Sequence, residues 1–205
     1  MKICTTDLHC GGGTVRVVLG KELPPILGKT LLEKRRYFRE NLDHIRKFLL
    51  HEPRGHEGLY GIIVLDDDDV SDCGDATNND VKCDVSLILL HNAGLGSFCG
   101  HGSIALGRYL IDTGIIRQPT SPQTKVTLRC PCGVVRVFVD YENGKTGKAR
   151  FLSVPSFIFA KGAHSFNEII IFKYRQIVFP IHFKDYFQNH KQNNPFDIKR
   201  FFTCL

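Results

Sequence analysis

Residues 98–114 read Phe-Cys-Gly-His-Gly-Ser-Ile-Ala-Leu-Gly-Arg-Tyr-Leu-Ile-Asp-Thr-Gly, a run of small and apolar residues. We predict a helix from Cys99 to Thr113, with Gly114 as its C-cap signal. Each of the three glycines inside it costs about 1 kcal/mol relative to alanine in a helix interior. Two gains would offset that cost: close approach of neighbouring strands, and backbone N–H groups left open to a ligand.

Cys99, at the start of this helix, is the leading candidate for chemistry. The positive end of the helix dipole favours a thiolate there and is expected to lower the pKa of the thiol. The amides of Gly100 and His101 have no partner within the helix, point outward and suit a carboxylate. A carboxylate held beside a thiolate is the arrangement needed to remove the α-proton of an amino acid.

Two other interpretations of Cys99 stay open. Most free cysteines are small buried hydrophobes, and Cys99 would then have only a packing role. Alternatively, the thiol is a nucleophile with His101 as its base. A separation of two residues places side chains on different sides of a helix, so this pairing is expected to be geometrically poor.

The other patterns predict an α/β chain with several short strands and two prominent helices. Strands are expected at 13–19, 85–90, 126–128, 134–139 and 149–154. The run 85–90 is apolar throughout, as in a strand buried on both faces. The second helix is expected over 31–50, since Thr30 and Glu33 have capping-box spacing and Pro53 would end it. Its buried stripe comprises Leu31, Phe38, Leu42, Ile45 and Leu49.

Three further segments have both a functional and a structural interpretation. Residues 66–80 are acidic and suggest a cation site, but adjacent aspartates do not by themselves build a coordination sphere, so a solvated loop is favoured. Residues 130–132 (Cys-Pro-Cys) are half of a zinc motif without a second pair, so a turn is favoured. Asp7, His9 and Cys10 precede three glycines that would either bind a small anion through their amides or form a flexible turn.

The composition is that of a globular protein: 42% of the 205 residues are hydrophobic and 23% are charged. The net charge of +6 comes with no recognised nucleic-acid-binding motif, so we expect no nucleic-acid partner. Residues 1–7 contain no apolar run typical of a secretory signal, and no stretch approaches the roughly 20 apolar residues of a membrane span. We therefore expect a cytoplasmic protein, without membrane contact, whose eight cysteines are reduced.

The chain changes character near residue 160. Ten of the fifteen phenylalanines lie between Phe157 and Phe202, among scattered basic residues and asparagines. No period of about 2 or 3.6 residues persists there, so the pattern predicts no element. We expect two parts, residues 1–159 and an unassigned aromatic, basic tail at 160–205.

Several motifs resemble the proline racemase family in order and spacing. They are Asp7-Leu8-His9-Cys10-Gly11-Gly12, the run from Lys34-Arg35-Arg36-Tyr37-Phe38-Arg39 through His51-Glu52-Pro53-Arg54-Gly55-His56, and Cys99-Gly100-His101. Three more favour the animal branch of that family, the trans-3-hydroxy-L-proline dehydratases. These are Leu90-His91-Asn92, Ala105-Leu106-Gly107-Arg108 and Cys130-Pro131-Cys132-Gly133. The resemblance runs from about Ile3 to Phe159.

The resemblance implies a lobe like that of diaminopimelate epimerase, with a strand barrel around a central helix and the substrate clamped between two such lobes. It implies that Cys99 removes the α-proton, that the Gly100 and His101 amides hold the carboxylate, and that neither a metal nor an organic cofactor takes part. The expected substrate is a small amino acid, trans-3-hydroxy-L-proline, which would lose water to give a pyrroline-2-carboxylate. Proline racemisation or hydroxyproline epimerisation is the alternative, and a homodimer is one expected assembly.

The chain departs from the family's pattern in two places. The family has His-Thr-Gly-Gly-Glu-Pro near its N-terminus, whereas residues 9–14 here read His-Cys-Gly-Gly-Gly-Thr. The second-lobe motif, with a cysteine in racemases and a threonine in the dehydratase, is missing. The resemblance therefore leaves a non-catalytic alternative: a truncated form that is unstable, inert or associated with intact subunits.

Overall fold

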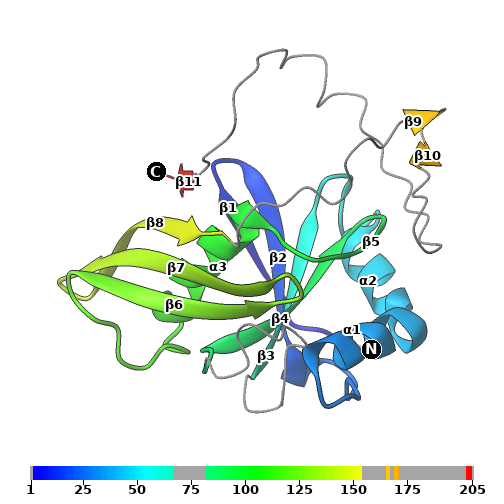
Figure 1. Ribbon diagram of the computed structural model, residues 1–205, viewed down its shortest axis with the longest axis horizontal. Helices are drawn as coiled ribbons and strands as arrows, with labels where there is room; N and C mark the ends of the chain where they lie inside the picture. The colour runs from blue at the N-terminus through cyan, green and yellow to red at the C-terminus, as the bar shows by residue number, and fades with distance from the viewer. Residues whose placement is uncertain (1, 67–81, 154–164, 167–168, 171–201, 205) are drawn as a thin grey trace. The chain divides into compact units, whose positions relative to one another are not determined.

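The computed structural model describes residues 2–66, 82–153, 165–166, 169–170 and 202–204 (Figure 1). The strands are β1 (Thr6–Cys10), β2 (Gly13–Leu19), β3 (Tyr60–Asp66), β4 (Val85–His91), β5 (Gly94–Gly96), β6 (Gln123–Cys130), β7 (Gly133–Glu142), β8 (Lys145–Leu152), β9 (Ser165–Phe166), β10 (Ile169–Ile170) and β11 (Phe202–Cys204). The helices are the 3-10 turn η1 (Gly20–Glu22), α1 (Leu31–Asn41), α2 (Asp43–Leu50) and α3 (Gly100–Asp112).

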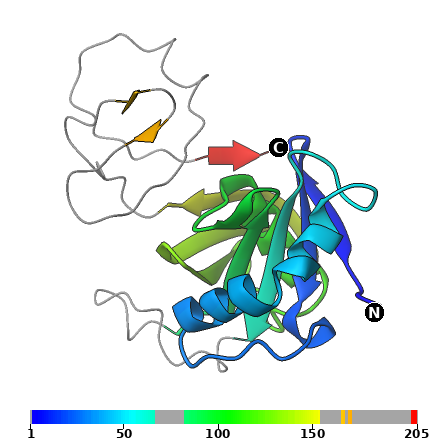
Figure 2. The same cartoon turned by 90° about the vertical axis from the view of Figure 1, so that its right-hand side faces the viewer.

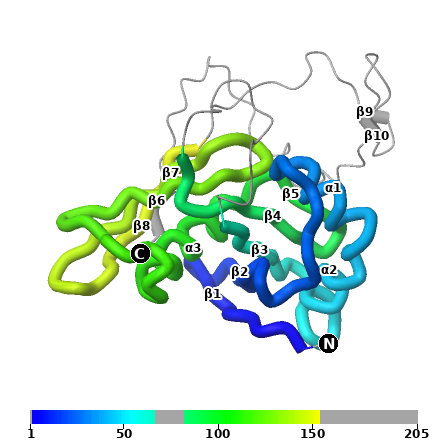
Figure 3. The backbone as a smooth tube through the Cα atoms, turned by 90° about the horizontal axis from the view of Figure 1, so that it is seen from below, coloured from blue at the N-terminus to red at the C-terminus, as the bar shows by residue number. Residues whose placement is uncertain are grey.

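One mixed sheet curls around α3. Its strand order in the described residues is β1-β2-β3-β4-β6-β7-β8-β11, with β5 paired to β4. The pairs β2–β3 and β4–β6 are parallel. Helix α3 contacts β1 and β2 towards one edge of the sheet and β7 and β8 towards the other, so the sheet must bend around it. Figure 2 and Figure 3 show α3 between these two groups of strands. The predicted arrangement of strands around a central helix is confirmed.

Apolar side chains cover both faces of the middle strands, because successive residues of a strand point to opposite sides. One core lies between the sheet and α3, and it includes Val17, Ile62, Val64, Leu87, Leu89 and Leu106. The other lies beneath α1 and α2, and it includes Val18, Ile63, Leu65, Ile88, Leu90 and Phe38. The prediction that residues 85–90 form a strand buried on both faces is confirmed.

The helix expected over 31–50 is two helices. Leu42 ends α1 and precedes α2 with a non-helical conformation, φ −123° and ψ 11°. The capping box is confirmed: the Glu33 amide donates to the Thr30 hydroxyl at 3.1 Å, and the Thr30 amide donates to the Glu33 carboxylate at 3.2 Å. The whole predicted stripe is buried. The break at Leu42 contains neither glycine nor proline, and the helical spacing of the apolar residues continues through it. The sequence pattern therefore gives no sign of two helices.

The glycines after His9 form a hairpin turn. Cys10 pairs with Gly13 across the β1–β2 hairpin, and Gly11 and Gly12 have φ of 57° and 89°. Positive φ at both central residues is the type I′ geometry that fits the twist of two-residue hairpins. The flexible turn considered for these glycines is therefore an ordered one, and the residues before it form β1, which the sequence pattern did not predict.

Some of the remaining predictions are confirmed, and others concern residues outside those that the structure describes. The other predicted strands are confirmed, with β6, β7 and β8 longer than expected. The short strand β5 follows β4 and pairs with it. The acidic segment after Asp66 and the boundary at residue 159 lie outside the described residues. Two short stretches of the tail form a β9–β10 ladder, while β11 pairs with β8. No helix in the described residues is long and apolar enough to span a bilayer.

Gly107 sets how closely α3 approaches the sheet. A Cβ at this position would lie 2.6 Å from Cγ1 of Val137. Overpacking a core costs about 1–3 kcal/mol, which outweighs the roughly 1 kcal/mol that alanine adds to a helix.

We therefore expect Gly107→Ala to lower the free energy of unfolding by about 1 kcal/mol in urea titrations. Val137→Ala should relieve the crowding, so the double variant should be more stable than the sum of the two single changes predicts. Strict additivity of the two changes would contradict this packing.

Candidate active site

Cys99 and His101 lie at the end of the sheet where β2 and β3 begin. The Cys99 sulfur is 3.5 Å from Nδ1 of His101. Nε2 of His101 is 3.4 Å from the carbonyl oxygen of Thr14. The ring of Tyr60 meets the His101 ring edge-on, with 5.0 Å between their centroids. Three segments far apart in the sequence therefore converge on one imidazole.

The contact between Cys99 and His101 contradicts the expectation of poor pairing geometry. That expectation treated both residues as helical, but Cys99 is the N-cap of α3 with φ −145° and ψ 106°. An extended residue before the first turn points its side chain back over that turn. The thiol can therefore reach a histidine two residues further on.

The partners of His101 define its neutral tautomer. A backbone carbonyl can only accept a hydrogen bond, so Nε2, which faces the Thr14 carbonyl, carries the proton. In that tautomer Nδ1 is the acceptor nearest the Cys99 thiol, whose sulfur lies 3.5 Å from Nδ1 and 3.8 Å from Nε2. This is the arrangement of a thiol with a base in contact, one of the interpretations left open by the sequence.

Burial changes the acidity of Cys99 in the direction opposite to the sequence prediction. The residue is only 5% exposed. Burial raises the pKa of its thiol from 9.0 to about 11, and the nearby Gly102 amide opposes this with a smaller effect. The prediction of a lowered pKa is therefore wrong: without a base to take its proton, the thiol is neutral at physiological pH.

Glycines make room around the thiol. A Cβ at Gly102 would lie 2.9 Å from the Cys99 sulfur, and one at Gly100 would lie 3.2 Å from the ring of Phe151. Gly100 and His101 occupy the first two positions of α3, where amides have no partner within the helix. These two amides are the donors from which the expected carboxylate cradle would be built.

Hydrogen bonds join the loop at residues 51–56 to the turn after β4. The buried guanidinium of Arg46 donates to the carbonyl of His91 at 3.0 Å and to that of Asn92. The Asn92 amide donates in turn to the carbonyl of His56 at 2.9 Å. These bonds hold the His56 side chain beside β2, where its Nε2 is 3.3 Å from the Thr14 hydroxyl.

Arg16 secures the same loop from β2. It donates to the carbonyls of Leu49 at 2.6 Å and Arg54 at 2.8 Å, and it forms two 2.7 Å bonds with the Asp7 carboxylate. These bonds from Arg16 hold the pKa of Asp7 below its ordinary value. Arg16 on β2 and Asp7 on β1 therefore both help to hold the loop at residues 51–56 in place.

Sequence reasoning missed Thr14 and Tyr60 as residues of this site. They come together because β2 and β3 are parallel and Val15 lies opposite Tyr60 in the register. No local pattern identifies them, since 46 positions separate Thr14 from Tyr60 along the chain. Only the parallel pairing of β2 with β3 in the sheet brings both residues to His101.

Cys130, Cys132 and Cys10 lie in turns and strands and form contacts with a structural role. Residues 130–132 form the β6–β7 turn, as favoured, and a hydrogen bond between Cys130 and Cys132 raises the pKa of the first and lowers that of the second. Within the described residues no three His, Cys, Asp or Glu side chains are arranged to hold a metal ion. Cys10 is disulfide-bonded, so the expectation that all cysteines are reduced is wrong for this residue.

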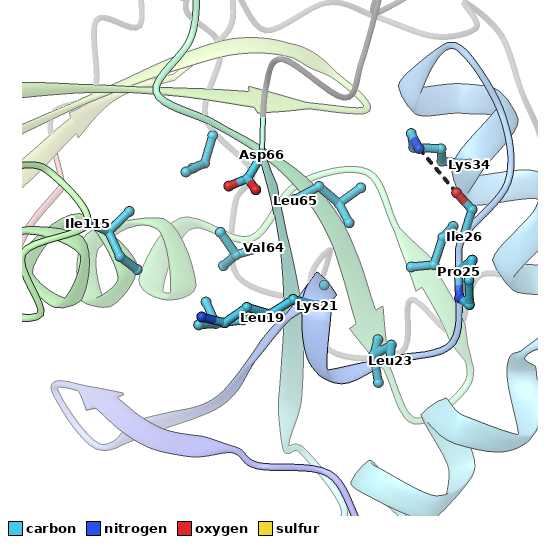
Figure 4. A pocket seen from close by; sticks show the side chains of 12 residues that line it. Leu19, Lys21, Leu23, Pro25, Ile26, Lys34, Val64, Leu65, Asp66 and Ile115 are labelled. Atoms are coloured by element: carbon cyan, nitrogen blue, oxygen red, sulfur yellow. Dashed lines mark hydrogen bonds between the residues drawn. The ribbon is translucent and has the colours of Figure 1, made fainter.

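A pocket of about 530 Å³ lies at the opposite end of the sheet from Cys99 (Figure 4). Leu19 and Asp66, which line it, are the last residues of β2 and β3, whereas the Cys99 cluster lies where those strands begin. Ile115, also in its lining, follows the C-terminal end of α3. None of the predicted site residues contributes to it.

Comparison with known proteins finds extensive similarity. A family model described as proline racemase matches residues 5–166. A trans-L-3-hydroxyproline dehydratase of Saccoglossus kowalevskii is 44% identical over 153 residues, 75% of this chain and 43% of the relative. The trans-3-hydroxy-L-proline dehydratase of Homo sapiens is 40% identical over 161 residues, 77% of this chain and 42% of the relative.

Two solved structures share the fold. A hydroxyproline epimerase from Agrobacterium vitis with bound trans-4-hydroxy-L-proline has a TM-score of 0.65 at 23% identity, covering 81% of this chain and 46% of its own. A probable proline racemase from Agrobacterium radiobacter K84 with bound carbonate has a TM-score of 0.65 at 26% identity, covering 82% of this chain and 48% of its own. The expected fold class is confirmed, and the chain spans less than half the length of each of these four proteins.

The raised pKa of Cys99 can be measured by alkylation. Short pulses of iodoacetamide, followed by mass spectrometry of the Cys99 peptide, should show the main rise in rate centred near pH 11. The folded pKa lies above the unfolded value, so ionisation of Cys99 should also lower the stability of the fold as pH rises from 9.0 towards about 11. A main rise below the ordinary thiol pKa would contradict burial as the dominant effect.

Proposed function

The chain belongs to the proline racemase family, and from that premise we propose that it forms the first lobe of a hydro-lyase that dehydrates trans-3-hydroxy-L-proline. The names of the curated relatives support this substrate. The observation that carries the proposal is the 3.5 Å contact between the Cys99 thiol and Nδ1 of His101. It supplies an acid–base pair at the start of a helix whose amides suit a carboxylate.

The proposed reaction begins with proton transfer from Cys99 to His101. The amides of Gly100 and His101 hold the substrate carboxylate, and the thiolate takes the α-proton. The electron pair of the broken Cα–H bond forms a double bond to C3, and the 3-hydroxyl leaves as water. The proton stored on His101 balances the hydroxide that leaves, and the thiol is restored. The enamine product tautomerises to a pyrroline-2-carboxylate.

The high pKa of Cys99 has a use in this scheme. A thiol that ionises at about 11 gives a more basic thiolate than one at 9.0, and a stronger base removes a weakly acidic proton faster. The difficulty is to form that thiolate at neutral pH. In this scheme His101 makes the thiolate accessible at neutral pH, because its Nδ1, 3.5 Å from the Cys99 sulfur, receives the proton.

Racemisation of proline or epimerisation of hydroxyproline is the alternative function. Both reactions share the removal of the α-proton but return a proton to the opposite face instead of losing water. The names of the two solved structures favour this alternative, whereas the relatives with higher sequence identity favour dehydration. The decision rests on a catalytic group in the second lobe, which we expect to be threonine in a dehydratase and cysteine in a racemase.

A chimera tests the proposed function directly. Residues 2–153 of this chain would replace the matching lobe of the Saccoglossus relative, and loss of trans-3-hydroxy-L-proline would be followed by chromatography. We expect turnover by the chimera and a fall of about 10³-fold in its Cys99→Ser variant, the usual contribution of a general acid–base group. Cys4→Ser, at an exposed free thiol, is the matched control.

The same chimera separates the two reactions in deuterated water. Incorporation of deuterium at Cα of L-proline without loss of water from trans-3-hydroxy-L-proline would favour the racemase. Undiminished dehydration by a folded Cys99→Ser chimera would exclude the proposed role of Cys99.

The 205-residue chain by itself should show little or no turnover. The proposed site lies between two lobes, and this chain supplies the donors and the base of one side only. Saturable loss of trans-3-hydroxy-L-proline with the purified chain, abolished by Cys99→Ser, would contradict this expectation.

A further inference from the structure

Gly13 and Thr14 lie against His101 but have no part in the reaction just described. They are the first two residues of β2, paired with Cys10 and His9 across the hairpin. Both stand at positions where residues 9–14 depart from the family's usual pattern. The side chains that accompany these contacts therefore differ from those of the family's usual pattern.

Gly13 leaves the space that the His101 ring occupies. A Cβ at Gly13 would lie 3.2 Å from Cδ2 and 3.4 Å from Cγ of that ring, tighter than ordinary van der Waals contact. Gly13 is not among the glycines with positive φ, so the backbone conformation itself would accept another residue. The imidazole is thus one reason for a glycine here, although the Cβ would also lie 3.3 Å from the Cys10 carbonyl oxygen.

Thr14 is held in place from the opposite direction. Nδ1 of His56 lies 2.8 Å from the carbonyl of Glu57 and must donate to it, so Nε2 of His56 is an acceptor. The Thr14 hydroxyl donates to that Nε2 at 3.3 Å. The carbonyl of the same threonine accepts from Nε2–H of His101. A continuous series of hydrogen bonds therefore runs from Glu57 through His56 and Thr14 to His101.

We propose that Gly13 and Thr14 are positioning residues that hold the His101 imidazole against the Cys99 thiol. Gly13 leaves room for the ring, and the Thr14 hydroxyl, bound to His56, anchors the carbonyl that fixes the tautomer of His101. The proposal deepens the proposed function and rests on it, since it names what keeps the base of Cys99 in place. Neither residue touches the thiol, so both act through His101.

The test uses the complete 205-residue chain and the alkylation rate of Cys99 as a function of pH. With His101 in place, the imidazole assists alkylation and increases the rate at pH values below the main rise. Gly13→Ala crowds the ring, and Thr14→Val removes the hydroxyl contact with His56 that anchors the Thr14 carbonyl. Each change should lower the rate at about pH 8 by roughly fivefold, the factor expected when one ordinary hydrogen bond is lost. His101→Ala should lower that rate at least as far.

Two matched controls separate positioning from a general effect on the fold. Gly96→Ala adds a methyl group to another strand glycine, where the nearest atom is 3.6 Å away. Thr6→Val changes an exposed threonine at the far end of the same hairpin. Both should keep the wild-type rate within about twofold, and all variants should converge with the wild type when the pH is high enough for the thiolate to react without a base.

A wild-type pH profile in both Gly13→Ala and Thr14→Val would overturn the proposal. An equal loss of rate in Gly96→Ala would also overturn it. So would a rate in Gly13→Ala that is increased at every pH, because Gly13 would then serve the folding of the hairpin and not the position of His101. If Gly13→Ala fails to fold, Thr14→Val alone decides between these outcomes. Alkylation needs no substrate, so absence of dehydration by the chimera would refute the proposed function and leave this result standing.

Discussion

The close approach of α3 to the curled sheet is the constraint on which the rest of the structure depends. The helix contacts strands from both edges of the sheet, and at Gly107 there is no room for a methyl group beside Val137. The two glycines in its interior, Gly102 and Gly107, weaken the helix by about 1 kcal/mol each. The fully buried Leu106 and Leu110 anchor it in the first core. The position of Cys99 follows, because it is the residue at which this buried helix begins.

That position subjects the Cys99 thiol to two opposed effects. A helix dipole stabilises an anion by about 0.3–1 kcal/mol, which is less than one pKa unit. Burial raises the pKa of the thiol to about 11, well beyond what the dipole offsets. The helix end alone therefore does not make a thiolate. In the proposed mechanism the missing acceptor is His101, whose Nδ1 lies 3.5 Å from the sulfur.

Much of this arrangement could be predicted from the sequence, and what escaped prediction has identifiable causes. Local sequence patterns located α3, the capping box at Thr30 and the strands β2, β4, β6, β7 and β8. The break at Leu42 has no local signal. The contact between Cys99 and His101 depends on Cys99 being extended rather than helical. Thr14 and Tyr60 reach the site through the parallel pairing of β2 with β3, which no single segment of sequence encodes.

The tautomer of His101 tests the central claim most directly. Nitrogen-15 NMR of the ring at about pH 8, where an ordinary histidine is neutral, reports which nitrogen carries the proton, and the signals are assigned by their loss in His101→Ala. The structure predicts a protonated Nε2 directed at the Thr14 carbonyl and an unprotonated Nδ1 facing the Cys99 thiol. A protonated Nδ1, or rapid averaging of the two tautomers, would contradict the account.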